Sequence, residues 1–276
     1  MLLLNVLKDL RFALRLLRKS PAFTLTALLT LAFGIGATTA IFSIVEGVLL
    51  RPLPFFQQDR LLCFGDVPEG VPTGGQPNAT APGVRIYMRD MTAFSSLGAY
   101  QQTGYELSGV SEPAQINASR LTASIFPVLG VSPLMGRPFT QQEDEGSRQV
   151  AVISYQMWHS RFQEDPHILG QKIQLDRRPY EIIGVMPRGF EFPLVPGQLN
   201  RSELWVPMSF TQGELVNGAG SWNYNMVGRL KPGVTAAQAL QDARPIAQQI
   251  ERNFPPGMGS LRIHPVAVPL TEATVA

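Results

Sequence analysis

The residue types that most often carry chemistry are sparse in this chain, and they are not spaced for it. The three histidines, His159, His167 and His264, form neither an HExxH pattern nor the Cys/His spacings of zinc sites. The one cysteine, Cys63, has no partner for a disulfide within the chain, and its apolar neighbours predict a small buried side chain. We expect surface positions for the histidines and no metal site.

The sequence also lacks the motifs of nucleotide hydrolysis and nucleophilic catalysis. It contains no G-x-x-x-x-G-K-[ST] phosphate loop and no G-x-S-x-G turn. Two acidic clusters, Glu143–Glu145 and Glu164–Asp165, lie in polar, turn-like sequence, where such clusters are usually solvated. The sequence therefore predicts a protein that is not an enzyme and that uses no cofactor.

An uncharged run near the beginning of the chain is the strongest structural feature. Residues 21–45 contain no Asp, Glu, Lys or Arg. As a helix they would extend about 38 Å, more than the roughly 30 Å hydrocarbon core of a bilayer. A cleaved signal peptide has an apolar region of only about 7–15 residues, and soluble helices are seldom this long. We expect an uncleaved transmembrane helix over residues 21–50.

Positive charges before this run predict its direction. Lys and Arg near a span stay on the cytoplasmic side, so we expect a cytoplasmic N-terminus. Leucines recur among these cations at spacings of three and four, which predicts a basic amphipathic helix over residues 1–20, at the surface of the lipid bilayer. The residues that set the orientation are Lys8, Arg11, Arg15, Arg18 and Lys19, opposed only by Asp9.

Small residues within the run have the spacing of a helix-packing face. Ala32, Gly36 and Ala40 are four residues apart, so they lie on one side of a helix. Small side chains at this spacing let a second helix approach closely. We therefore expect partners within the membrane.

Composition separates the first 50 residues from the remainder. Five of the 23 basic and two of the 21 acidic residues lie there, which leaves 18 basic against 19 acidic residues in 51–276. The net charge of that part is −1, so nothing in it favours a nucleic-acid partner. Its 226 residues can bury one sizeable core or two small ones.

Strand-like and helix-like patterns alternate after residue 50. The mixture predicts an α+β fold over residues 51–276, with an inserted subdomain at about 110–200. We expect strands at 61–64, 97–107, 114–121, 150–153, 172–175, 180–185, 222–230 and 261–268. We expect helices at 83–94, 124–129, 155–163 and, after a Thr235 cap, to about residue 253.

Several long stretches, in order over residues 8–270, resemble one family of membrane proteins, the MacB-like/FtsX-like ABC transporter permeases. The resemblance is strongest to the acidobacterial duplicated orphan permease group. The stretches are DLRFALRLLRKSPAFT, LAFGIGATTAIFSIVEGVLLRPLPF, ASIFPVLGVSPLMGRPFTQQED, VAVISYQMWHSRF, ILGQKIQLDRRPYEIIGVMPRGFEFP, ELWVPM and NYNMVGRLKPGVTAAQA.

The resemblance implies a MacB-like periplasmic core domain over residues 51–276, with two subdomains, held in the bacterial inner membrane by the first helix of a permease. It implies as partners other permease helices or a second permease copy, a separate cytoplasmic ATPase subunit and a periplasmic adaptor. ATP hydrolysis inside the cell would move the core domain for export or mechanotransmission.

Such permeases continue into further spans and an ATPase-coupling loop. Because this sequence ends without a second apolar run, we expect a truncated product or a fragment.

Two other interpretations stay open on the residues alone. The chain could be a signal-anchored extracytoplasmic binding or sensor domain without a transport role. It could also be an anchored extracytoplasmic enzyme, although no catalytic spacing supports that. A reading frame that continues downstream into three or more apolar spans would favour the permease.

Overall fold

The computed structural model of the chain describes residues 15, 18–49, 55–71, 77–110, 113–146, 148–193 and 201–273. They belong to two compact units, Met1–Pro52 and Leu53–Ala276. Each unit is described by itself.

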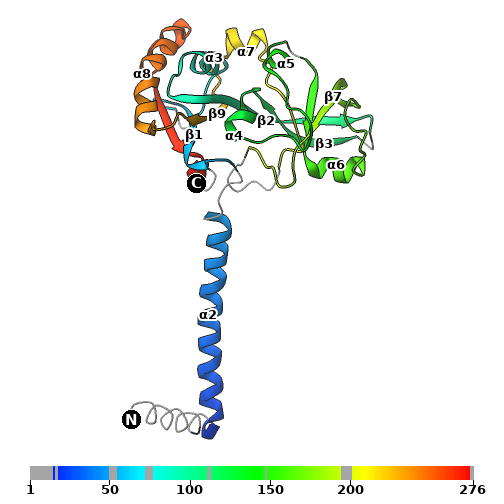
Figure 1. Cartoon of the computed structure of the whole chain (residues 1–276). Helices are drawn as coiled ribbons and strands as arrows, with labels where there is room; N and C mark the ends of the chain where they lie inside the picture. Colours follow the sequence, from blue (N-terminus) through cyan, green and yellow to red (C-terminus); the bar gives the residue numbers. More distant parts are fainter. Residues whose placement is uncertain are drawn as a thin grey trace. The chain divides into compact units, whose positions relative to one another are not determined.

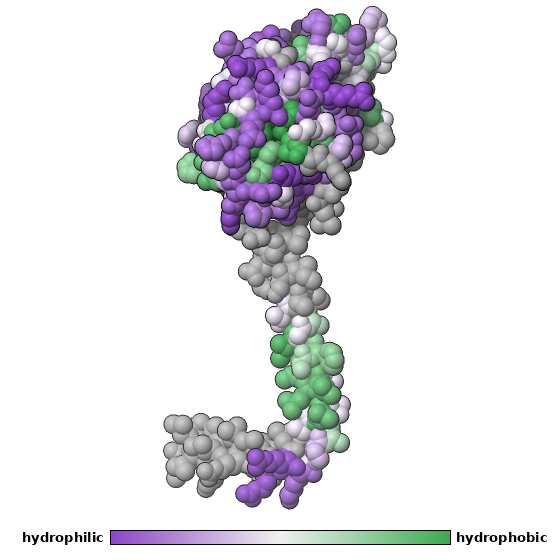
Figure 2. All heavy atoms as spheres, turned by 90° about the vertical axis from the view of Figure 1, so that its right-hand side faces the viewer, coloured by the Kyte–Doolittle hydropathy of each residue, from purple (hydrophilic) through white to green (hydrophobic). Residues whose placement is uncertain are grey.

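The first unit contains one long helix, α2 (Pro21–Leu49) (Figure 1). Its stretch Pro21–Thr39 is long and apolar enough to cross a membrane. In the space-filling view the described side chains of α2 are mostly apolar, whereas hydrophilic residues predominate on the visible face of the domain (Figure 2). Several threonine hydroxyls donate to carbonyls one turn earlier, as Thr26 does to Ala22 at 2.9 Å. These hydroxyls need no partner outside the helix, which suits lipid surroundings.

The second unit is built on one ten-stranded sheet with helices packed on it (Figure 1). The strands are β1 (Leu61–Pro68), β2 (Phe94–Ser108), β3 (Ala114–Leu121), β4 (Met135–Gly136), β5 (Val150–Ile153), β6 (Lys172–Leu175), β7 (Arg178–Val185), β8 (Leu204–Pro207), β9 (Asn225–Leu230) and β10 (Ile263–Pro269). The α-helices are α3 (Ala81–Asp90), α4 (Ile125–Leu129), α5 (Gln141–Glu145), α6 (Tyr155–Phe162), α7 (Gln212–Asn217), α8 (Ala236–Arg252) and α9 (Leu270–Ala273), and 3-10 turns lie at Gln58–Arg60, Gly218–Gly220 and Pro256–Met258.

The strand pairings join an open sheet to a closed ring. The sheet order is β10-β1-β9-β2-β3-β8-β5-β7-β4, and β6 pairs with both β2 and β7. Six strands therefore close on themselves in the order β2-β3-β8-β5-β7-β6. Two pairs, β3/β8 and β5/β7, are parallel, and the other pairs are antiparallel. The long strand β2 belongs to both parts, because it pairs with β9 up to Tyr100 and with β6 at Leu107.

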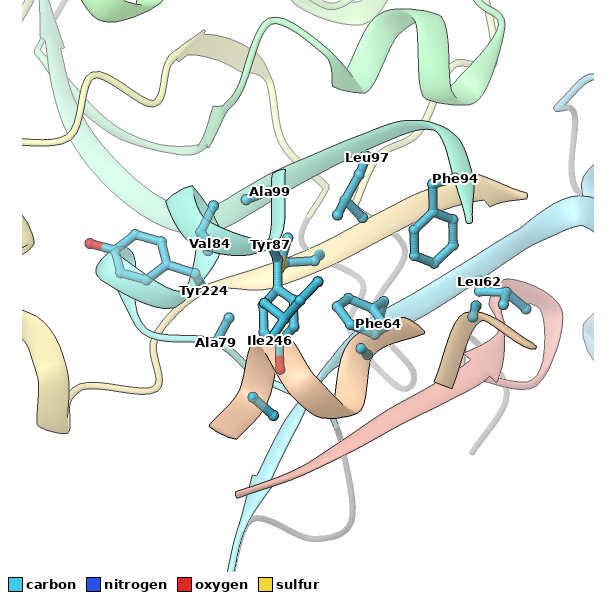
Figure 3. Packing of buried hydrophobic residues seen from close by; sticks show 14 of the residues in the cluster. Leu62, Phe64, Ala79, Val84, Tyr87, Phe94, Leu97, Ala99, Tyr224 and Ile246 are labelled. Atoms are coloured by element: carbon cyan, nitrogen blue, oxygen red, sulfur yellow. The ribbon is translucent and has the colours of Figure 1, made fainter. Parts of the chain in front are cut away.

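Three hydrophobic clusters fill the unit. The first lies between the open sheet and the helices α3 and α8, where Tyr87 packs edge-on to Phe64 at 4.9 Å between ring centroids (Figure 3). The third fills the ring, and all its buried residues fall between Leu107 and Val206. The second lies on the other side of the ring strands, since Trp205 belongs to it whereas its neighbours on β8 belong to the third cluster.

The α+β class, with an apolar N-terminal helix followed by a mixed domain, is confirmed. The inserted subdomain at about 110–200 stays a prediction. The helix expected at 83–94 spans Ala81–Asp90 instead. Its N-cap is Thr80, whose hydroxyl accepts from the backbone of Gly83 at 3.1 Å. It ends early because the N–H groups of Thr92 and Ala93 donate to the carboxylate of Asp242.

In the acidic cluster Glu143–Glu145, Glu145 is exposed as expected, but Glu143 is buried, so the expectation of a solvated turn was wrong for Glu143. The cluster belongs to α5, whose capping box joins Thr140 and Glu143. The Glu143 side chain is 6% exposed and binds Arg137 at 2.7 Å. The strand β8 and the helix α7 were not predicted, and the strand expected at 222–230 begins at Asn225.

Candidate functional site

The side chains that could carry chemistry are dispersed over the second unit. Within the described residues, no group of three or more His, Cys, Asp and Glu side chains is placed to hold a metal ion. Cys63 is buried, and this burial raises the pKa of its thiol to about 12. The thiol therefore stays protonated and unreactive at neutral pH. His159, His167 and His264 lie at the surface, as predicted.

A groove of about 600 Å³ runs beside α6. The helix is started by Ser154, whose hydroxyl accepts from the backbone of Met157 at 3.0 Å, and this cap directs the first turn of α6 toward the groove. The lining residues are Ser154–Gln156, His159, Pro187–Glu191 and Arg201–Glu203.

The charged side chains around this groove are paired with one another. Arg201 binds Glu191, and Arg161 binds Glu203 at 3.1 Å. Glu164 accepts hydrogen bonds from Tyr155 and from His159, which lower the pKa of its carboxyl. The charges of these side chains around the groove are therefore balanced in pairs.

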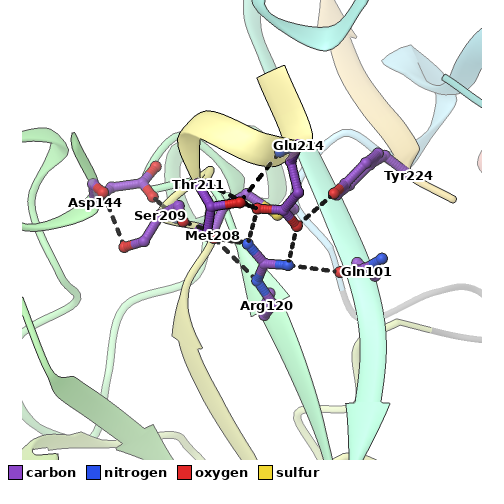
Figure 4. A network of polar contacts seen from close by, with 8 residues as sticks. All are labelled: Gln101, Arg120, Asp144, Met208, Ser209, Thr211, Glu214 and Tyr224. Atoms are coloured by element: carbon purple, nitrogen blue, oxygen red, sulfur yellow. Dashed lines mark hydrogen bonds and ion pairs between the residues drawn. The ribbon is translucent and has the colours of Figure 1, made fainter. Parts of the chain in front are cut away.

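A second polar cluster joins the ring to the open sheet (Figure 4). The guanidinium of Arg120, on β3, donates to the carbonyl of Met208 at 3.0 Å and to the carboxylate of Glu214 at 2.6 Å. Glu214 also accepts from the hydroxyl of Tyr224 at 2.7 Å and caps α7 together with Thr211. Burial acts to raise the pKa of Glu214, but these hydrogen bonds outweigh it and lower that pKa to about 2.

The first and last described segments of the second unit lie in the same part of its core. Phe55, near the start of the unit, and Leu270, in α9, are both buried in the second hydrophobic cluster. Leu62 on β1 pairs with Pro269 on β10, so the first and last strands lie side by side. Both ends of the unit therefore contribute to one hydrophobic core.

A buried cation lies close to the first of these segments. Arg229, on β9, is 8% exposed and donates to the carbonyls of Val128 at 2.9 Å and of Gln57 at 3.2 Å. The ring of Phe56 lies over its guanidinium, at 5.8 Å from the ring centroid to Cζ. Burial and the neighbouring Arg60 lower the pKa of Arg229. Sequence reasoning missed this site, because nothing in the local pattern marks Arg229 as buried.

The roles predicted for the residues that orient and pack the membrane helix stay predictions. Lys8 and Arg11 lie outside the described residues, and Arg15, Arg18 and Lys19 are exposed.

On α2, Ala32 and Gly36 are exposed, and a Cβ added at Gly36 would meet nothing within 4 Å. Ala40 continues the helix, but its side chain lies outside the described part of the chain. The predicted packing face thus includes open space at Gly36.

Comparison with known proteins identifies relatives of both the helix and the domain. The family model of the MacB-like periplasmic core domain matches residues 24–246. Over 125 residues the chain is 26% identical to the macrolide export ATP-binding/permease proteins MacB of Escherichia coli (strain K12) and of Shigella dysenteriae. These matches cover 45% of this chain and 18% of each relative, so the chain corresponds to a small part of them.

Solved structures share the fold at low sequence identity. The extracellular domain of the noncanonic ABC-type transporter YknZ from Gram-positive bacteria is 17% identical, with a TM-score of 0.51 over 74% of this chain and 98% of that one. The periplasmic region of MacB from Actinobacillus actinomycetemcomitans is 14% identical, with a TM-score of 0.54 over 77% and 90%. A domain of a putative permease from Porphyromonas gingivalis, also 14% identical, gives a TM-score of 0.56 over 78% and 92%.

Proposed function

The chain belongs to the family of MacB-like periplasmic core domains, and from that membership we propose that it is the extracytoplasmic part of an ABC-type permease. In this proposal it is a non-catalytic subunit, or a fragment of one, in an exporter or a mechanotransmission complex. One observation carries the proposal. The family model covers residues 24–246, and so includes most of α2 as well as the folded domain.

In this function a separate cytoplasmic ATPase supplies the energy and α2 transmits the motion. The shared burial of Phe55 and Leu270 supports that role, because a displacement where the chain enters reaches the core that also holds its last helix. Close-packed interiors have low compressibility and transmit such displacements. The same motion would be presented to a periplasmic adaptor.

Four of the six ring strands, β3, β5, β6 and β7, lie within residues 110–200 and would form most of the inserted subdomain proposed there, and β2 and β8 complete the ring from outside it. Its interior cluster is confined to residues between Leu107 and Val206, which supports this boundary. The shared strand β2 would then be the structural connection between the two subdomains. The Arg120–Glu214 contact would set how firmly they hold together.

The topology belongs to the same proposal. The cations before α2 support a cytoplasmic N-terminus and a location in the bacterial inner membrane. Ala32, Gly36 and Ala40 would face other permease helices or a second permease copy. The motifs quoted above also favour the acidobacterial duplicated orphan type.

Purification of the tagged full-length chain from its native membranes tests this function. We expect an ABC ATPase subunit to co-purify in stoichiometric amounts. A matched control carries the domain of residues 53–276 behind an unrelated transmembrane helix, and we expect it to lose that subunit. Full-length chain that is folded and membrane-bound but free of any ATPase would contradict the permease assignment.

The groove beside α6 favours a second candidate, an anchored binding or sensor domain. Its volume of about 600 Å³ is within the range of small-molecule sites, about 300–1,000 Å³. A domain that purifies without an ATPase but retains a small molecule in this groove would support that candidate.

A further inference from the structure

The guanidinium of Arg229 is only partly satisfied. Its Nε and one terminal nitrogen donate to the carbonyls of Val128 and Gln57. Its other terminal nitrogen, Nη2, is buried and has no hydrogen-bond partner among the described residues. Buried polar groups are nearly always hydrogen-bonded, because an unmet donor costs free energy. An unmet N–H on a cation indicates a place for an anionic oxygen.

An exposed aromatic side chain lies over the guanidinium that carries this nitrogen. The Phe56 ring lies above the guanidinium but is itself 66% exposed, which is unusual for a large apolar side chain. Gly130, in the left-handed conformation at φ 69°, lies next to both Phe56 and this nitrogen. A Cβ added to Gly130 would lie 3.2 Å from the Phe56 Cβ and 3.7 Å from Nη2. Because the Phe56 ring over the guanidinium is exposed, it can move aside when a ligand oxygen approaches.

The surroundings are cationic. Arg60 lies close enough to lower the pKa of Arg229, and Lys231 follows two residues later on the surface. Asp59 is the one acidic side chain that acts on Arg229 in the opposite sense. Arg229 and Arg60 against the one carboxylate of Asp59 leave a net positive charge, which attracts an anion.

Chain length limits how far this site can lie from the membrane. Only six residues lie between Leu49, the last residue of α2, and Phe56, which makes seven Cα–Cα steps. A chain of that length spans at most about 25 Å. Segments that lie at the interface between lipid and water combine Trp, Phe or Leu side chains with Lys or Arg. This step rests on the proposed membrane anchoring by α2.

We propose that Phe56 and Arg229 form a lipid-headgroup site on the outer surface of the membrane. The Phe56 ring enters the interface, and Nη2 of Arg229 donates to a phosphate oxygen of a phospholipid. The contact holds the entry of the domain against the bilayer. It also supplies the acceptor that the buried guanidinium lacks.

Quenching by brominated lipids tests the site in the full-length chain. The chain carrying Phe56→Trp is reconstituted into phosphatidylethanolamine/phosphatidylglycerol liposomes. Both leaflets contain brominated acyl chains, so quenching is detected for either orientation of the chain in the liposome. The control is Val216→Trp, at a similarly exposed position on α7, on the opposite side of the domain from the C-terminal segment that follows β10 (Figure 1). Quenching of the three native tryptophans is subtracted. We expect several-fold stronger quenching of the indole at position 56 than at position 216.

Two further measurements separate the outcomes. Adding Arg229→Gln to the Phe56→Trp chain should reduce the quenching at least by half, with the circular dichroism spectrum unchanged. Inorganic phosphate added to the detergent-solubilised Phe56→Trp chain should leave its emission unchanged. An emission change with phosphate as large as that in liposomes would overturn the assignment to lipid.

Flotation of the liposomes distinguishes this inference from the proposed function. A chain that floats with the lipid but shows equal quenching at positions 56 and 216 overturns the headgroup site and leaves the anchor intact. A chain that does not float overturns the anchor and the headgroup site together.

Discussion

Arg120 on β3 and Glu214 on α7, 94 residues apart, form an ion pair at 2.6 Å in which both side chains are largely buried. The pair holds α7, which lies beside the open sheet, to a strand of the ring. Arg120 reaches Gln101 on β2 as well, at 2.9 Å. The contact between the two parts of the domain is therefore made by a hydrogen-bonded network in addition to the shared strand β2.

Glu214→Gln should destabilise the domain. The substitution leaves the half-buried guanidinium of Arg120 without its counter-charge, and hydrogen bonds to charged groups contribute about 1.5–3 kcal/mol. We expect a loss of that size in the free energy of unfolding, measured by guanidinium denaturation of the full-length chain in mild detergent.

The exposed pair formed by Arg89 and Asp90 provides the control. Arg89→Gln should change the free energy of unfolding little, because surface ion pairs are screened by solvent. Equal losses in the free energy of unfolding for Glu214→Gln and Arg89→Gln would show that the Arg120–Glu214 network stabilises the domain no more than an exposed ion pair does.

The buried carboxyl of Asp66 should make stability depend on pH. Burial raises its pKa from 3.8 to about 7, against the hydrogen bond from Tyr87, which lowers it. Because the folded pKa lies above the unfolded one, protonated Asp66 contributes stability that is complete below about pH 4 and is lost as the pH rises toward 7. Asp66→Asn removes this titration and can still accept from Tyr87.

The measurement compares urea unfolding of wild type and Asp66→Asn at several pH values. The variant should gain stability relative to wild type between about pH 4 and about pH 8. Asp59→Asn, at an exposed position, should show no such trend. A difference between wild type and Asp66→Asn that is constant with pH would mean that Asp66 is ionised in the folded domain throughout.

Gly136→Ala should weaken the pairing of the edge strand β4 with the ring strand β7. A Cβ at this position would lie 2.1 Å from the carbonyl of Ile183, so β4 must move away from β7. Gly189 has a similar backbone conformation, φ 75° against 73°, but open space around it. Gly189→Ala should cost about 1–2 kcal/mol for the left-handed backbone alone. Gly136→Ala should cost clearly more, and similar melting temperatures for the two variants would contradict the close approach.

Local patterns predicted most elements because local interactions form them. The Thr235 cap was sufficient to predict α8, whose buried face includes Ala243, Ile246 and Ile250. The helix α7 was missed although its signature, Thr211 followed three residues later by Glu214, is a capping box. Only six residues long, α7 buries none of them, so it lacks the periodic apolar pattern by which the longer helices were recognised.

The ring and the candidate sites could not be read from local patterns. Closure of the ring depends on Leu107 pairing with Leu175, 68 residues away, and no periodicity within β2 or β6 encodes that partner. Glu143 looked solvated because its neighbours are polar. Its burial follows from a contact with Arg137 that only the folded chain forms. The burial of Arg229 was missed for the same reason, because its contacts form only in the folded chain.

Gly36→Leu should weaken association of α2 with other helices. If Ala32, Gly36 and Ala40 form a contact face, a larger side chain at Gly36 keeps the partner backbone away, and helix attraction in lipid depends on close approach. A membrane two-hybrid assay or energy transfer measures the association. Leu29→Ile, a swap of similar volume, is the control and should do little. If Gly36→Leu leaves the association unchanged, α2 serves only to anchor the chain in the membrane.

Cysteine accessibility in whole cells tests the central claim, a membrane-anchored extracytoplasmic domain, most directly. The native Cys63 is buried, so it leaves the labelling background low. Gln142→Cys places a thiol on an exposed position of α5, and Asn5→Cys places one before the membrane helix. A membrane-impermeant maleimide should modify Gln142→Cys and spare Asn5→Cys in intact cells, and should modify both after lysis. Labelling of Asn5→Cys with protection of Gln142→Cys in intact cells would contradict the orientation and the extracytoplasmic assignment together.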